Sequence, residues 1–213
     1  MKRSPVATWI GRLASAGAGL VFPGTALAHH AMGGAPPSTT LEGILSGLAH
    51  PVLGPDHLLF LLVAGLLVAP LPAAARLAAA ALLVIGQMLG TALHLAAVGL
   101  QGVDALIALT VIAGGLILAA RPLGASVLAA LLAASGVFHG YAYAESIVGV
   151  EAGPLSAYLV GLALAQLACV LGVAGARRAL EDRSAALRIA VAHRLTAGAV
   201  VTAGAAFLLL AIV

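Results

Sequence analysis

The chain contains little charge and almost no cysteine. Only 8% of its 213 residues are Asp, Glu, Lys or Arg, whereas 62% are hydrophobic. A soluble domain carries about 25% charged residues. So few charges cannot cover a surface that faces water, which excludes a soluble enzyme, a nucleic-acid-binding domain and a disordered chain, and predicts that lipid is the main solvent. The single cysteine, Cys169, excludes an intramolecular disulfide and any Cys-rich metal site.

The net charge of +3 comes from the N-terminus, which has the pattern of a secretory signal peptide. Three basic residues, Lys2, Arg3 and Arg12, come before an apolar run at 13–22. A Pro-Gly break and small residues that end at Ala28 follow this run. About 10 apolar residues are too few to cross a ~30 Å hydrocarbon core, which argues against the alternative of an uncleaved anchor. Removing three of the ten basic residues leaves seven, equal to the seven acidic ones, so no acidic partner is implied.

The remaining chain predicts an all-α integral membrane protein with a six-span helical bundle. We expect a cleavable signal peptide at 1–28, a short extracytoplasmic segment at 29–40 and a transmembrane transport domain at 41–213. Thr39 and Glu42 form a capping-box pattern at the start of the first helix. Gly86 and Gly90 suit close helix packing, although scatter of small residues explains them equally well. The expected spans are 41–69 with a break at His50-Pro51, 73–99, 103–120, 122–148, 154–176 and 195–213.

The arginines predict the orientation of this bundle. Signal cleavage places the mature N-terminus outside the cytoplasmic membrane of a bacterium, so the loops after spans one, three and five lie inside. All seven arginines of the mature chain fall in those loops or at the adjoining span ends, as the positive-inside rule requires: Arg76, Arg121, Arg177, Arg178, Arg183, Arg188 and Arg194. The predicted topology is therefore N-out and C-out.

The first span contains ionisable residues that are costly in a membrane and are therefore candidates for function. Two prolines and a glycine between His50 and His57 predict a broken helix, which is tolerated at membrane depth only inside protein or beside a wet cavity. Two imidazoles and the Asp56 carboxylate suit Ni²⁺, Co²⁺ or Zn²⁺. The alternative is a periplasmic loop whose polar residues face water.

The fourth span contains His139 and Glu145. On a straight helix His139 shares a face with Tyr143 and Ser146, whereas Glu145 lies about 120° away from His139. His139 is near the middle of the span, which makes it a candidate metal ligand. The alternative is a core histidine that bonds to a neighbouring carbonyl.

Three further histidines are candidate ligands. His94 lies in the outer half of the second span, at a depth similar to the other candidates, and its alternative is a residue of the membrane interface. His29 and His30 would begin the mature chain, where a free amine beside two imidazoles can hold a cation. An ordinary polar terminus is the alternative there.

At these residues the sequence resembles the HupE/UreJ family of nickel/cobalt permeases. The family pattern H-P-x-x-G-x-D-H is matched at every fixed position by the segment from His50 to His57. A second pattern, close to F-H-G-x-A-H-G-x-E, is matched in part by Phe138, His139, Gly140 and Ala142. The chain departs from that pattern at three positions, because Tyr143 stands where a second His is frequent, Ala144 replaces Gly, and Glu145 comes one residue early.

The resemblance implies a permease that imports Ni²⁺ or Co²⁺ as its substrate, with no tightly bound cofactor, for metalloenzymes such as hydrogenase or urease. Selection among Ni²⁺, Co²⁺, Zn²⁺ and Cu²⁺ stays open, as does assembly into a homo-oligomer. The expectation is a transporter and not an enzyme, with the lipid bilayer and the metal ion as partners and no nucleic acid. The alternatives are a membrane-embedded metalloenzyme, or a metal-binding membrane protein such as a sensor or chaperone-like partner, that uses the same cluster without translocation.

Overall fold

The computed structural model describes residues 35–120, 122–181 and 186–212, and this part of the chain contains helices and no strands. The predicted signal peptide, together with His29 and His30, lies outside the described residues. The helices are α2 (Thr40–Leu53), α3 (Pro55–Val68), α4 (Ala73–Leu95), α5 (Val103–Ala119), α6 (Ala125–Tyr143), the short 3₁₀-helix η3 (Ala144–Ile147), α7 (Ala152–Glu181) and α8 (Ala186–Ile212).

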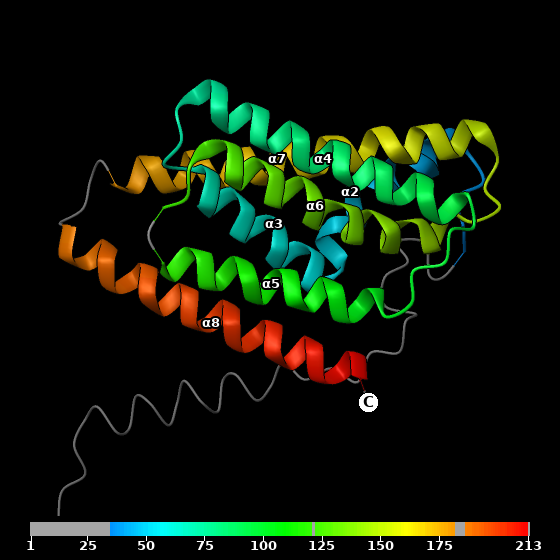
Figure 1. The fold of residues 1–213 in the computed structure, drawn as a ribbon. Coiled ribbons are helices and arrows are strands. Elements are labelled where there is room, and N and C mark those ends of the chain that lie inside the picture. The colour runs from blue at the N-terminus through cyan, green and yellow to red at the C-terminus, as the bar shows by residue number, and fades with distance from the viewer. Residues whose placement is uncertain (1–34, 121, 182–185, 213) are drawn as a thin grey trace, which may run out of the picture.

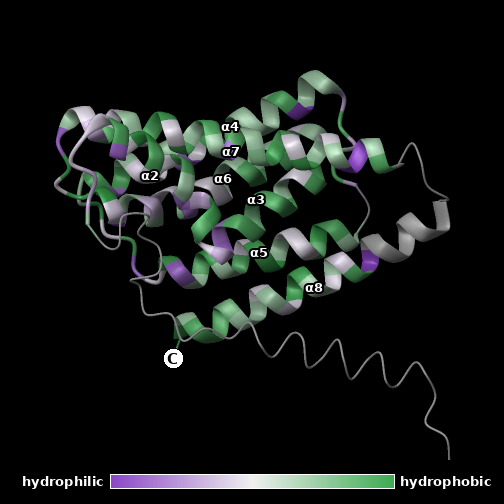
Figure 2. Cartoon of the chain, turned by 180° about the vertical axis from the view of Figure 1, so that it is seen from behind, coloured by the Kyte–Doolittle hydropathy of each residue, from purple (hydrophilic) through white to green (hydrophobic). Residues whose placement is uncertain are grey.

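Within the described residues, four helical segments are long and apolar enough to cross a membrane: Ala73–Leu95, Ala125–Ile147, Ala152–Leu180 and Arg194–Ile212. The pair α2 and α3 makes a fifth if the two helices, which meet at a bend of 79°, form one span. α5 is apolar but shorter, with 17 residues. Large apolar side chains such as Ile85 and Leu209 are each 61% exposed, and Figure 2 shows hydrophobic colour along the outer helices. The chain therefore has the surface of a multi-pass membrane protein.

α3 lies at the centre of the bundle and contacts each of the other α-helices whose bounds are given above (Figure 1). Around it the remaining helices associate mainly as three close pairs, α4 with α6, α2 with α7, and α5 with α8. Near the start of α3, the side chains of His57 and Phe60 are buried in the bundle.

Glycines allow the α4–α6 pair to approach closely. A Cβ atom added to Gly86 would collide with the carbonyl group of Ala133, and one added to Gly140 would collide with the backbone of Gln87. Gly90 meets α6 in the same way at Val137. The close packing predicted from Gly86 and Gly90 is confirmed, and it holds the middle of α6 in a defined position against α4.

The break between α2 and α3 lies at Gly54, three residues after Pro51. α2 continues through His50-Pro51, where the sequence predicts the interruption, because a ring at Pro51 removes only one backbone donor. The N–H of Gly54 donates to the carbonyl of His50 at 3.3 Å and closes α2. Pro55 then occupies the first turn of α3, where a missing N–H costs nothing.

Three arginines gather at the other end of α3. Arg76 and Arg178 donate to the carbonyl of Ala69 at 3.2 and 3.3 Å, and Arg177 donates to the carbonyl of Leu66 at 2.6 Å. Positive charge is favourable at a helix C-terminus because the last carbonyl groups have no partner in the helix. The arginine end of the bundle is thus opposite the end of α3 that begins beside Gly54.

Candidate metal centre

Three of the histidines singled out in the sequence converge in the structure. His50 lies in the last turn of α2, His57 lies in the first turn of α3, and His139 lies on α6. The Nδ1 atoms of His57 and His139 are 3.0 Å apart, and the ring centroids of His50 and His57 are 6.1 Å apart. All three side chains are buried. The bend at Gly54 brings the last turn of α2 and the first turn of α3 to one place.

The contacts of His139 decide which of its nitrogens carries the proton. Its Nε2 atom is 2.9 Å from the hydroxyl oxygen of Thr110 on α5. That hydroxyl donates its only proton to the carbonyl of Ile107 at 2.7 Å, so it accepts from the Nε2–H of His139. The neutral ring then presents an unprotonated Nδ1 atom, with its lone pair, toward His57. Hydrogen bonding of the distal ring nitrogen is how proteins orient imidazoles that bind metals.

Two hydroxyl groups orient His50. Its Nδ1 atom lies 2.7 Å from the hydroxyl of Tyr158 and 3.2 Å from that of Ser146. Both hydroxyls also reach the carbonyl of Tyr143, at 3.2 Å from Tyr158 and 3.1 Å from Ser146. When that carbonyl accepts both protons, Nδ1–H of His50 donates to Tyr158, and Nε2 carries the lone pair on the other side of the ring.

Aromatic rings enclose the three imidazoles. The Tyr143 ring lies between two of them, with centroids 5.0 Å from His50 and 4.3 Å from His57. Phe60, one turn after His57, stacks on His139 with centroids 3.9 Å apart and planes at 16°. These rings limit the access of water, so contacts between polar groups inside the cluster are stronger than they would be in solvent.

Gly54 and Asp56 position His57. A Cβ atom on Gly54 would lie 2.7 Å from Cδ2 of His57, so only glycine leaves room for that ring. Asp56 Oδ1 accepts the backbone N–H of His57 at 2.8 Å. A carboxylate in the first turn also stabilises the N-terminus of α3 through its dipole. In this conformation, one Asp56 oxygen is engaged with the backbone beside the histidines.

His94 and Glu145 have other surroundings than the three buried histidines. The His94 ring packs on Tyr141, with centroids 4.4 Å apart, and Tyr141 in turn bonds to the loop between α4 and α5 at Val98 and Leu100. Glu145 is exposed on η3, between buried neighbours. The structure therefore brings together His50, His57 and His139, whereas His94 packs on Tyr141 and Glu145 is exposed.

Among the described residues, no group of three or more His, Cys, Asp or Glu side chains has the arrangement of a metal site. The cluster offers two imidazoles in direct contact and a third nearby, supported by hydroxyl groups. Sequence reasoning missed Thr110 and Tyr158, which hold His139 and His50. Thr110 is the only hydroxyl residue in α5, and that isolation was the one signal available in the sequence.

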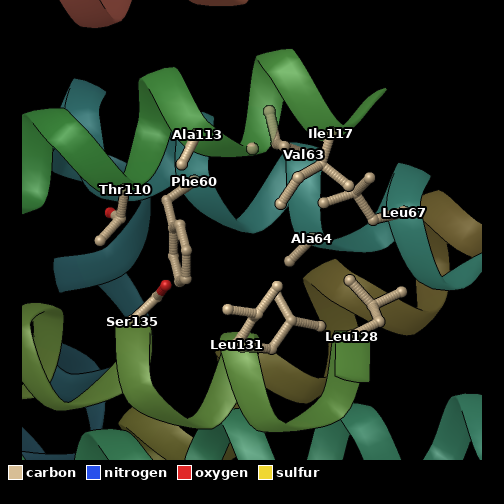
Figure 3. A pocket seen from close by; sticks show the side chains of 12 residues that line it. Phe60, Val63, Ala64, Leu67, Thr110, Ala113, Ile117, Leu128, Leu131 and Ser135 are labelled. Atoms are coloured by element: carbon tan, nitrogen blue, oxygen red, sulfur yellow. The ribbon is translucent and has the colours of Figure 1, made fainter. Parts of the chain in front are cut away.

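An apolar pocket adjoins the cluster between α3, α5 and α6 (Figure 3). Phe60 and Thr110, which contact His139, lie at one end of its lining, and the lining continues to Ile117 and Leu128. Ser135 and Thr110 are its only polar lining residues, so the pocket offers an ion almost no ligands.

Comparison with known proteins places these features in a family. The family model described as HupE / UreJ protein matches residues 18–207, which is most of the chain and includes both histidine segments. No curated protein and no solved structure matches the chain.

Proposed function

The chain belongs to the HupE/UreJ family, and we propose that it is a permease that imports Ni²⁺ or Co²⁺ across the bacterial cytoplasmic membrane. The family is associated with nickel and cobalt transport, and the long apolar helices suit a protein of the bilayer. The imported ion would serve metalloenzymes such as hydrogenase or urease.

The observation that carries this proposal is the contact between His57 and His139. Two nitrogens that each lie about 2.1 Å from one ion, at a right angle, are themselves about 3.0 Å apart. The Nδ1 atoms have this separation in the structure. An ion that replaces the shared proton would therefore find two nitrogens at a suitable separation once each ring turns its lone pair toward the ion, and His50 lies near enough to join them.

A small ligand set suits a cargo ion. A resident zinc site normally uses three or four protein ligands, whereas an ion in transit must bind well enough to enter and weakly enough to leave. The histidines are neutral ligands, so an ion in the cluster keeps its full charge and responds to the membrane potential. At ~2.3 kcal/mol per charge per 100 mV, a divalent ion gains about 4.6 kcal/mol on entry.

The proposed topology has six spans, with α2 and α3 as one bent span and α5 as a short one. After removal of the signal peptide at 1–28, the N-terminus and C-terminus lie outside. The arginine end of α3, with Arg76, Arg177 and Arg178, then faces the cytoplasm, in keeping with the positive-inside rule. The ion enters beside His50 and leaves toward that end.

Flux into proteoliposomes that contain a metal-sensitive dye tests the proposal. We expect uptake of Ni²⁺ or Co²⁺ with intact protein, and loss of this uptake in His57→Ala and His139→Ala. Protein-free vesicles should give no dye signal. Parallel runs with Zn²⁺ and Cu²⁺ give the selectivity. Absence of flux with folded protein, or unchanged flux in both variants, contradicts the proposal. Tight stoichiometric retention of metal through purification, without flux, would indicate a metalloenzyme or a metal-binding protein that does not translocate.

A further inference from the structure

Two glutamines are fully buried in the middle of the bundle without hydrogen-bond partners. Gln87 on α4 and Gln166 on α7 each have 0% exposure, and neither amide makes a hydrogen bond to any described residue through its Oε1 or Nε2 atom. An unsatisfied amide is costly in a membrane interior, where no water replaces the missing hydrogen bonds. These side chains are therefore suited to a polar occupant.

Gln166 lies next to the histidine cluster, and Gln87 lies where α4 packs on α6. The side chain of Gln166 is beside the hydroxyl of Tyr143, close enough for a polar interaction, although the geometry is not that of a hydrogen bond. Tyr143 in turn packs on His57. Gln87 faces α6 at Gly140, which lies one turn before Tyr143. Gln87, Tyr143 and Gln166 thus place unsatisfied buried polar atoms on α4, α6 and α7.

Gln166 lies on the arginine side of His50. Gln166 follows Tyr158, the partner of His50, by eight residues on α7, which is about 12 Å along the helix axis. Arg177, which bonds to the C-terminal end of α3, lies further along the same helix. Gln166 is therefore between the histidine cluster and the end of the bundle toward which the proposed transport runs.

We propose that Gln87, Gln166 and the Tyr143 hydroxyl line a second cation subsite, which takes the divalent ion with part of its water shell after it leaves the histidines. This inference rests on the proposed function. Amide and hydroxyl oxygens are harder, weaker ligands for such ions than imidazole, and the amide N–H groups can hold the remaining water. A neutral subsite lined by oxygen atoms can accept the ion from the histidines and release it readily, as conduction requires.

Leucine substitutions separate this role from a structural one. We expect Gln87→Leu and Gln166→Leu to lower the initial flux about tenfold while the Co²⁺ dissociation constant of the histidine cluster changes less than about threefold. Their melting temperatures should stay level or rise, because each change removes an unsatisfied buried amide. Gln101→Leu is the matched control, since Gln101 is the third glutamine and is exposed between α4 and α5.

The inference is overturned if both leucine variants transport at the wild-type rate. It is also overturned if both variants melt at lower temperature than wild type and Gln101→Leu does not, because that result shows that the two amides stabilise the fold.

A carboxylate variant tests the subsite without any need for flux. Gln166→Glu replaces a neutral oxygen ligand by a charged one, so calorimetric titration with Co²⁺ should detect one more bound ion per chain than in wild type or in Gln101→Glu. No additional ion in folded Gln166→Glu overturns the inference. An additional ion in a protein that shows no flux supports the subsite and contradicts the permease proposal, so the two failures are distinguishable.

Discussion

His57 and His139 face each other with their Nδ1 atoms 3.0 Å apart, although 82 residues separate them in the sequence. Each belongs to one of the two histidine segments, so this contact depends on how α3 and α6 are placed in the bundle. The contact exists because α3 occupies the centre of the bundle while glycine packing against α4 positions α6. Metal binding by this protein should therefore depend on residues that hold the two rings, and not only on the rings themselves.

The first prediction concerns Thr110, which accepts the Nε2–H of His139. Thr110→Val keeps the shape of the side chain and removes the hydroxyl that accepts the Nε2–H of His139. His139 therefore loses its preferred tautomer and orientation. We expect the affinity for Co²⁺ or Ni²⁺ to fall by about 10–100-fold, as for other hydrogen-bond partners of ligating histidines. Titration calorimetry measures the metal affinity. Thr110→Ser should restore binding, and Thr202→Val, at an exposed threonine on α8, is the control. Full affinity in Thr110→Val would show that the hydroxyl does not orient the ring.

The second prediction concerns Gly54. A methyl group there would lie 2.7 Å from Cδ2 of His57 and 3.3 Å from Oδ1 of Asp56. Gly54→Ala should displace the imidazole and weaken metal binding, at an overpacking cost of about 1–3 kcal/mol in the free energy of unfolding. Gly172→Ala has open space around its new methyl group and serves as the control. Metal titration and thermal unfolding in detergent measure the two effects. Wild-type metal affinity in Gly54→Ala would mean that His57 tolerates the shift.

The third prediction separates His94 from the three histidines that converge. Because its ring packs on Tyr141, we expect His94→Ala to change metal affinity less than about threefold, which corresponds to under 1 kcal/mol. His57→Ala, measured in parallel, should abolish binding. An equal loss of affinity in both variants would indicate that His94 moves into the cluster when an ion binds.

The fourth prediction concerns the stability of the α4–α6 pair. The Cβ atom of Gly140→Ala would collide with the backbone of Gln87, which cannot move aside as a flexible side chain can. We expect a loss of about 1–3 kcal/mol in the free energy of unfolding and a lower melting temperature. Gly175→Ala on α7, where nothing lies near the added methyl group, should not destabilise the protein. A melting temperature of Gly140→Ala equal to wild type would contradict this packing.

Local features of the fold could be read from the sequence because their causes are local. Thr39 and Glu42 form the expected capping box, with the Glu42 N–H donating to the Thr39 hydroxyl and the Thr39 N–H to the Glu42 carboxylate. The apolar stretches correspond to helices whose ends lie within a few residues of the expected ones, except that the last two helices, α7 and α8, extend further toward each other. The position of the break was less predictable, because a proline inside a helix removes one hydrogen bond and the packing around α2 decides whether the helix continues.

By itself the sequence determined that this chain belongs in a membrane. It also determined the approximate start of most helices and the rare polar residues that lie in them. Charge scarcity, apolar length and capping patterns act within one segment, so they can be recognised without knowing its neighbours. Only the tertiary structure decided that His50, His57 and His139 meet, that His94 packs on Tyr141, and that Thr110 and Tyr158 orient the rings. Helical periodicity specifies the face on which a side chain lies, but which faces come together depends on close packing between distant helices. That packing is set by glycines and side-chain shapes over the whole bundle.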